Sequence, residues 1–141
     1  MTKPNPDFHV VVMTGTTDGT GAATVDSYER NLIGLVEAVI IDGIALDDSA
    51  DLDINTVYDK MADGATERVG LDILDHGDVG NAAINELYPR DYEEDITGTD
   101  IAVATGVKTT RKFALAGCGL RVTVAAGGAT KAFQVRVLVR L

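Results

Sequence analysis

Residues 119–141 read GLRVTVAAGGATKAFQVRVLVRL, and this stretch decides the fold. Leu120, Val122 and Val124 alternate with polar or small residues, and from Phe133 onward an apolar residue again occupies every second position. A period of two is typical of a β-strand with one buried face. The connection AAGGAT contains paired glycines, which adopt positive φ at little cost. The stretch therefore predicts two strands joined as a hairpin with one buried face.

Further strands are predicted upstream, separated by turn-rich pieces. The segment Tyr28–Leu46 fits either an amphipathic helix or a strand buried on both faces, and the β-branched cluster Val39–Ile41 favours the strand. One short helical turn is expected within Asn81–Glu86. Several short strands at near-regular spacing predict an all-β fold, an antiparallel β-sandwich with a jelly roll as one version of it, and at most one short helix. The upstream strands are predicted at Phe8–Met13, Leu52–Tyr58, Glu67–Asp75 and Val107–Leu115.

One domain is expected for a chain of 141 residues, because this length buries enough surface for a single core. Residues 8–141 would form that domain, and residues 1–7 a flexible arm that orders on a neighbour. No apolar run reaches the roughly 18 residues of a membrane span, so we expect a soluble protein made in a cytoplasm. The predicted core residues are Leu120, Val122, Val124, Phe133, Val135, Val137, Leu71, Ile73 and Ile54.

Charge is divided unevenly along the chain. All 22 acidic residues lie at or before Asp100; with five Lys and Arg, residues 1–100 carry −17, and the other seven Lys and Arg give residues 101–141 a charge of +7. A folded protein with one acidic and one basic face is suited to docking on another surface or on copies of itself. The net acidity argues against nucleic acid as the main partner. Alternatively, the basic side chains lie on a hairpin at the edge of a sheet and protect it from pairing with the strand of another chain. The expected contact residues are Arg121, Lys131, Arg136 and Arg140, with Arg90 added.

A dinucleotide-binding motif is the sharpest enzymatic alternative. Gly19-Thr20-Gly21-Ala22-Ala23 follows a strand-like run, and Asp42 stands where a βαβ unit places its ribose-binding acid. Against this reading, the third glycine is missing and the loop from Thr14 is too long for a tight phosphate turn. We therefore expect no enzyme activity, and a nucleotide-binding enzyme is the lower alternative.

Metal and nucleophile patterns are also weak. The carboxylate clusters Asp47–Asp53 and Asp91–Asp95 offer oxygen ligands for calcium, but neither has the spacing of an EF-hand. Solvated loops account for both, and a structural calcium ion is the alternative. His9 and His76 stand apart from one another and from the single cysteine, Cys118, so neither a zinc site nor a Cys–His pair is predicted. No metal ion and no cofactor is expected.

Several pieces of the sequence together resemble one family. They are Thr17–Thr24, the hydrophobic run Leu35–Asp42 followed by the strand Asp51–Val57, the triplet Tyr88-Pro89-Arg90, and the closing pattern Leu120–Lys131 with its last strand. These pieces resemble small head-associated proteins of tailed bacteriophages. Proteins of this family are found beside the major capsid protein as decoration or auxiliary structural proteins.

This resemblance implies a structural protein of the virion that has no catalytic activity. A decoration or cement protein on the capsid exterior would bind the shell of the major capsid protein and stabilise it, because it favours the assembled state that it binds. We also expect a homo-oligomer, a trimer or a dimer, made in the host cytoplasm. A tail or neck subunit of the virion is the alternative.

Overall fold

The computed structural model describes residues 7–59, 62–64, 66–94, 97–100, 102–104 and 107–141. The regular structure in this part of the chain is β-strand apart from one 3-10 turn, η1 (Val79–Asn81). The predicted all-β class is therefore confirmed. No helix in the described residues has the length and apolar character needed to cross a membrane. Of the arm expected at residues 1–7, all but Asp7 lies outside the described part.

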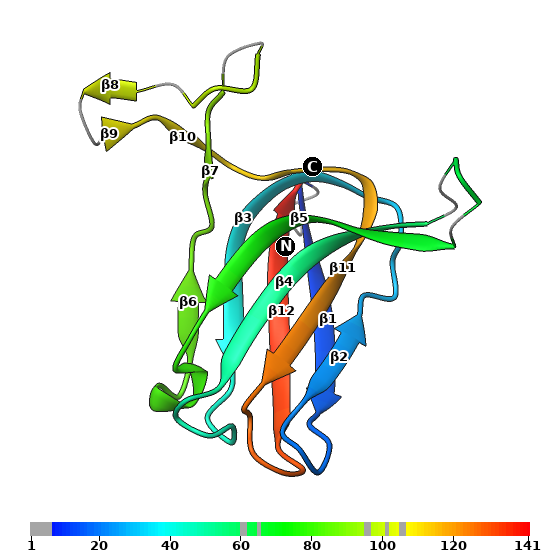
Figure 1. Cartoon of the computed structure of the whole chain (residues 1–141), viewed down its shortest axis with the longest axis vertical. Coiled ribbons are helices and arrows are strands. Elements are labelled where there is room, and N and C mark those ends of the chain that lie inside the picture. The colour runs from blue at the N-terminus through cyan, green and yellow to red at the C-terminus, as the bar shows by residue number, and fades with distance from the viewer. Residues whose placement is uncertain (1–6, 60–61, 65, 95–96, 101, 105–106) are drawn as a thin grey trace, which may run out of the picture.

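Eight strands form one continuous antiparallel sheet that folds over at β11 into two packed layers, which we call the first and the second sheet, and four short strands form two small sheets (Figure 1). The small sheets pair β7 with β10 and β8 with β9, and they lie beyond one end of the sandwich. In chain order the strands are β1 (Phe8–Thr16), β2 (Ala23–Asp26), β3 (Leu32–Asp42), β4 (Asp51–Asp59), β5 (Glu67–His76), β6 (Asn85–Leu87), β7 (Asp91–Tyr92), β8 (Ala102–Ala104), β9 (Val107–Lys108), β10 (Thr110–Arg111), β11 (Ala114–Ala125) and β12 (Ala132–Arg140).

Strand β11 belongs to both large sheets. Its beginning pairs with β3 in the first sheet, which also contains β1, β12 and β6. Its end lies between β2 and β4 in the second sheet, which β5 completes. The change falls at a bulge between Ala116 and Cys118, where Gly117 has a φ of 78°. Glycine adopts this conformation readily, so the strand can bend there from one sheet to the other.

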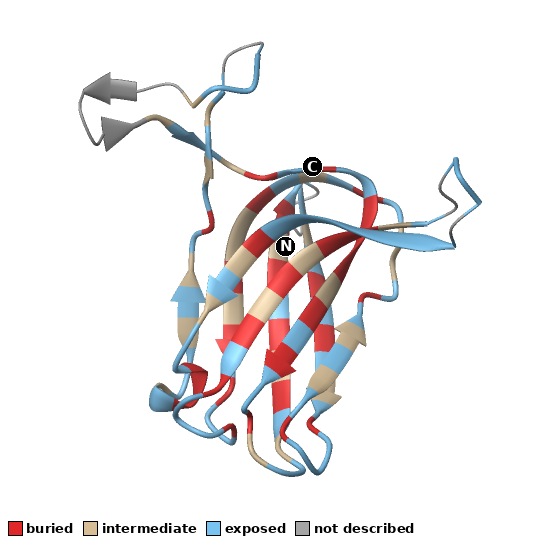
Figure 2. Ribbon diagram, in the orientation of Figure 1, coloured by how far each residue is buried: buried red, intermediate tan, exposed pale blue. Residues whose placement is uncertain are grey.

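The core lies between the two sheets, and buried and exposed residues alternate along the strands (Figure 2). Eight of the nine predicted core residues are at most 4% exposed, but Leu71 is 49% exposed. The prediction for Leu71 is wrong because the pairing of β5 with β4 shifts twice, on either side of Asn55. Each shift inserts an extra residue into β5, so the alternation counted back from Ile73 is lost before Leu71.

The predicted hairpin is wrong, although both of its strands exist. Val122 of β11 pairs with Ile54 of β4, whereas Val135 of β12 pairs with Ile41 of β3. The two strands therefore lie in different sheets, and their apolar faces meet across the core. Alternation of apolar residues shows which face of a strand is buried, but it does not show which strand lies beside it. Two strands that bury one face each can be neighbours in one sheet or can pack against each other from facing sheets.

Other local predictions are confirmed in part. The segment Tyr28–Leu46 contains a strand, β3, as favoured. The helical turn lies at Val79–Asn81, upstream of the expected Asn81–Glu86, because Asn85–Leu87 pairs with β3. The strand expected at Val107–Leu115 is divided among β9, β10 and the start of β11.

Candidate interaction surface

The outer face of the first sheet is unusually apolar. On β1, the side chains of Phe8, Val10 and Val12 are 37%, 49% and 51% exposed, while Val11 and Met13 point into the core. A sandwich strand normally alternates between apolar residues inside and polar residues outside. The adjacent valines of Phe8–Met13 were the sequence signal for this face, because they make the strand apolar on both sides.

Strand β12 adds two arginines to the same face. Arg136 lies between Val12 of β1 and Ile40 of β3, and Arg140 lies between Phe8 and Leu35 in the same way. Contiguous exposed apolar surface is typical of interaction sites, and arginine is enriched in protein interfaces. We call this surface the apolar–arginine face; it comprises Phe8, Val10, Val12, Leu35, Ile40, Arg136, Leu138 and Arg140, and the exposed carboxylates of Asp42 and Glu86 lie at its border.

The outer face of the second sheet is acidic. Asp51 and Asp53 of β4 lie beside Asp75 and Asp72 of β5, and Asp53 pairs directly with Asp75. Asp51, Asp72 and Asp75 are exposed and Asp53 is half-buried. These four residues form what we call the acidic face. The sandwich therefore has unlike outer faces, as expected, but the division runs between the two sheets and not between the two parts of the sequence.

Burial and neighbouring carboxylates raise the pKa of Asp53. Burial is the largest cause, followed by a hydrogen bond with Asp75 and by repulsion from Asp75, Asp72 and Asp51. The buried Oδ1 atom of Asp53 has no hydrogen-bond partner among the described residues. Compared with the unfolded chain, the folded protein therefore binds a proton at Asp53 more strongly, and ionisation of this group destabilises the fold.

Asp53→Asn is expected to raise the free energy of unfolding at pH 7 by up to about 1 kcal/mol, because like charges opposite one another on paired strands are destabilising. A raised pKa contributes stability that is fully present below the ordinary Asp value of 3.8 and is lost as the pH rises through the folded-state pKa. The gain should therefore disappear by pH 3.5. Urea unfolding at pH 7 and at pH 3.5 measures this gain in the free energy of unfolding. Asp48→Asn is the control, because Asp48 lies in an exposed loop. An equal gain for Asp53→Asn at both pH values would contradict the charge argument.

Arg121, one of the predicted contact residues, forms ion pairs within the protein, and its side chain is 19% exposed. Its Nε donates to Asp26 Oδ1 at 2.6 Å and its Nη2 to Glu67 Oε1 at 2.9 Å. Arg30 extends the network, with Nη2 2.6 Å from Asp59 Oδ1. The hydrogen bond from Arg121 outweighs burial and holds the pKa of Asp26 below its usual value. The edge-protection alternative also fails for Arg121, because β11 lies between β2 and β4 at this point.

Two of the predicted contact residues, Arg140 and Arg90, lie around one carboxylate, Glu37. Lys112 Nζ donates to Glu37 Oε1 at 2.6 Å, and Arg140 Nη1 is 3.8 Å from the same oxygen. The hydrogen bond from Lys112 lowers the pKa of Glu37 most, and the charges of Lys112, Arg140 and Arg90 add to this effect. Arg140 remains 55% exposed, so its guanidinium can still contact a partner.

The remaining two predicted contact residues differ in position. Arg136 donates from Nε to Gln134 Oε1 at 3.0 Å and forms no ion pair with any described carboxylate. Lys131 lies in the turn between β11 and β12, where its backbone N–H donates to Thr17 Oγ1 at 2.8 Å. The structure thus places Arg136 and Arg140 on one face with Arg90 near it, and places Arg121 and Lys131 elsewhere.

The glycine-rich loop after β1 does not have the form that a nucleotide site requires. Asp18 Oδ1 accepts hydrogen bonds from the backbone N–H groups of Thr20 and Ala22, at 2.8 and 3.1 Å. The Thr20 hydroxyl donates to the same oxygen and lowers the pKa of Asp18 most. The backbone N–H groups that could bind a phosphate in this turn are therefore already bound to the Asp18 carboxylate. Strand β2 follows, where a βαβ unit would place a helix with its N-terminus toward the phosphates.

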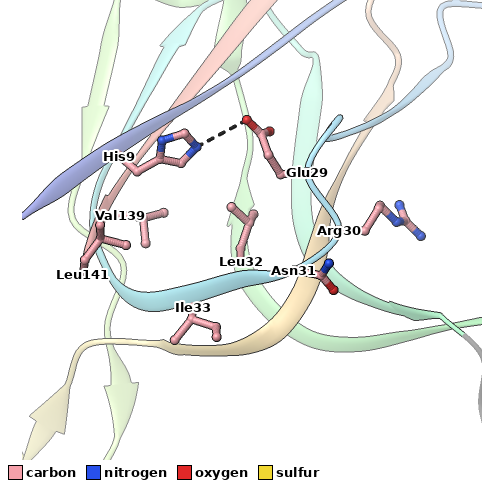
Figure 3. A pocket seen from close by; sticks show the side chains of 8 residues that line it. All are labelled: His9, Glu29, Arg30, Asn31, Leu32, Ile33, Val139 and Leu141. Atoms are coloured by element: carbon pink, nitrogen blue, oxygen red, sulfur yellow. Dashed lines mark ion pairs between the residues drawn. The ribbon is translucent and has the colours of Figure 1, made fainter.

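A hollow of about 400 Å³ opens where β1 begins and β12 ends, and Figure 3 shows the side chains that line it. His9 Nε2 is 3.3 Å from Glu29 Oε1, and both side chains are partly exposed. The lining contains no serine, threonine or cysteine that could act as a nucleophile. It consists of His9, Glu29, Arg30, Asn31, Leu32, Ile33, Val139 and Leu141.

The candidate metal ligands that lie in the described residues form no metal-binding group. In the described residues, no group of three or more His, Cys, Asp or Glu side chains is placed to hold a metal ion. Asp95, a member of the second carboxylate cluster, lies outside those residues. Cys118 is fully buried, and burial raises the pKa of its thiol, which disfavours the reactive thiolate.

Comparison with known proteins finds distant structural similarity only. No protein-family model and no curated protein matches the sequence. The crystal structure of PirA is 12% identical with a TM-score of 0.36, over 96% of this chain and 96% of that chain. The structure of infectious bursal disease virus, Gt strain, is 12% identical with a TM-score of 0.41, over 94% of this chain and 33% of that chain. A mutant VP2 protein of the same virus is 8% identical with a TM-score of 0.30, over 94% and 31% of the two chains. These similarities leave the function open.

Proposed function

We propose that the protein is a non-enzymatic structural component of a tailed-bacteriophage particle, a decoration or cement protein that binds the major capsid protein on the capsid exterior. The observation that carries the proposal is the difference between the two outer faces of the sandwich. The apolar–arginine face would contact the shell, and the acidic face would point to solvent. The family resemblance of the sequence supports this choice of partner.

The apolar–arginine face has the composition of a docking surface. Val10 and Val12 are about half exposed, so covering them would remove apolar area from water, which is worth roughly 25 cal/mol per Å². Arg136, which has no described carboxylate partner, would supply the charge that selects an acidic patch on the shell. Burial provides affinity here, and the arginines provide orientation.

The acidic face suits the opposite role. Its uncompensated aspartates favour hydration and repel the same face of other copies, so the exterior of a decorated shell would stay soluble. Many copies on a symmetric lattice strengthen a modest contact by avidity. Binding only the assembled shell would then stabilise it by mass action, without any catalytic step.

The double substitution Arg136→Glu with Arg140→Glu tests this function. Co-sedimentation with empty shells of the same phage should weaken by at least about tenfold, because two carboxylates would face the acidic patch. Arg68→Glu is the control, because Arg68 is an exposed arginine of β5 in the other sheet, where it pairs with Asp63. Circular dichroism should remain unchanged for both variants.

Three outcomes would contradict the proposal. If the double variant still binds shells as tightly as the parent protein, the chosen face is wrong. If the purified protein forms rings or tubes by itself under negative-stain microscopy, the tail or neck subunit is the better assignment. A rise in melting temperature with dinucleotides would point to the nucleotide-binding alternative.

A further inference from the structure

The two large sheets have edges at β1, β2, β5 and β6, and three of these are protected against pairing with another chain. Strand β2 has only four residues and β6 only three. Strand β5 has ten residues, but two shifts of register interrupt it, and it carries charged side chains that include Glu67, Arg68 and Asp72. Short length, bulges and charge are the usual protections of edge strands.

Strand β1 has none of these protections. It has nine residues, Phe8–Thr16, which pair with β12 without any shift of register. It contains no Asp, Glu, Lys, Arg or Pro, and its apolar residues point to both faces. In the described residues, no backbone hydrogen bond joins β1 to anything but β12. The backbone groups on its other side can therefore accept a further strand.

The position of β2 limits the part of β1 that is available. A Cβ atom on Gly15 would lie 2.5 Å from the side chain of Val25, so β2 approaches the end of β1. Residues 8–14 lie upstream of this approach, with the Glu29 side chain 3.3 Å from His9, and the middle of this segment is Val11. A strand centred on Val11 has apolar residues at equal distances on both sides, because Val10 and Val12 flank it.

We propose that a second copy of this chain pairs with β1 as an antiparallel strand, about a two-fold axis at Val11. In this register Val10 faces Val12 of the second copy, Phe8 faces Thr14 and His9 faces Met13. Directly opposed residues then share a face of the sheet, as antiparallel pairing requires, and no like charges meet. The segment is thus complementary to itself, which is the condition for a closed two-fold interface.

Pairing through β1 would also extend the proposed docking surface. The first sheets of both copies would become one continuous sheet, with the two apolar–arginine faces side by side. This consequence rests on the proposed function, whereas the dimer itself does not. Because a single strand pair is small compared with the roughly 1,200–2,000 Å² of a standard stable interface, dimerisation should depend on protein concentration.

Cysteine cross-linking tests the register. Val10→Cys is mixed with ¹⁵N-labelled Val12→Cys, oxidised, and the covalent dimers are identified by mass. Directly opposed Cβ atoms of paired strands are about 4.5–5.5 Å apart, close enough for a disulfide, whereas diagonal neighbours are about 7–8 Å apart. The mixed dimer should exceed either homodimer at least about fivefold. Cys118 does not interfere because it is fully buried.

Sedimentation equilibrium of the parent protein provides the second measurement. The average mass should rise with concentration from 14.8 kDa toward twice that value. A mass of 14.8 kDa up to several hundred micromolar would overturn the inference, as would equal yields of all three cross-linked dimers. A parent protein that dimerises through β1 but fails to bind shells would overturn the proposed function and support the strand pairing. A strictly monomeric parent protein that binds shells would do the reverse.

Discussion

Leu120→Ala is expected to lower the free energy of unfolding by about 3 kcal/mol, within the range of 2–5 kcal/mol typical of large-to-small substitutions in cores. Leu120 is fully buried. It lies on β11 just after the strand passes from the first sheet to the second, and its backbone N–H donates to Ser27 Oγ at 3.0 Å. The surrounding backbone is therefore held in place, and the cavity cannot readily collapse.

Urea unfolding followed by circular dichroism measures this loss. Leu141→Ala is the matched control, because Leu141 is 69% exposed, and its loss should stay below about 0.5 kcal/mol. A similar decrease for both substitutions would mean that the position of Leu120 between the sheets is wrong.

Gly34→Ala should cost about 2–3 kcal/mol, because it combines backbone strain with a steric clash. Gly34 has a φ of 139°, a conformation that other residues rarely adopt. A Cβ atom there would lie 2.3 Å from the carbonyl oxygen of Arg140 and 2.9 Å from Cγ1 of Val139. A backbone oxygen cannot turn aside as a flexible side chain can, so β3 and β12 would have to separate near the apolar–arginine face.

Gly19→Ala is the control for this substitution. Apart from Gly19 itself and its two neighbours in the chain, no heavy atom lies within 4 Å of the position that a Cβ atom there would occupy. We expect a change of less than about 0.5 kcal/mol, as for other exposed positions. Thermal unfolding of both variants measures the difference, and an equally large loss at Gly19 would contradict the open position of this loop.

The strands and most of the core could be predicted from local pattern. The period of two in β12 requires one face of the strand to be buried, whatever its neighbours are, and Phe133, Val135 and Val137 are buried accordingly. The same argument fails at Leu71, because inserted residues in β5 change which side chains point inward. A bulge depends on how two strands pair, and the sequence of one strand does not show it.

The interaction surface could be predicted only in part. The arginines of β12 were found because they alternate with core residues, but Arg121 fits the same pattern and is engaged by Asp26 and Glu67. These carboxylates are 95 and 54 residues away in the chain. Local charge counting therefore overestimated how much positive charge remains free for a partner.

By itself the sequence determined that this protein is made of β-strands with one buried face and that β1 is apolar on both faces, since these properties follow from the side-chain period of an extended backbone. Only the tertiary structure decided that β11 and β12 lie in different sheets and that the acidic and apolar–arginine faces lie on opposite sides. Strand pairing joins residues far apart in the chain, and it depends on packing of the whole core, which no local pattern contains.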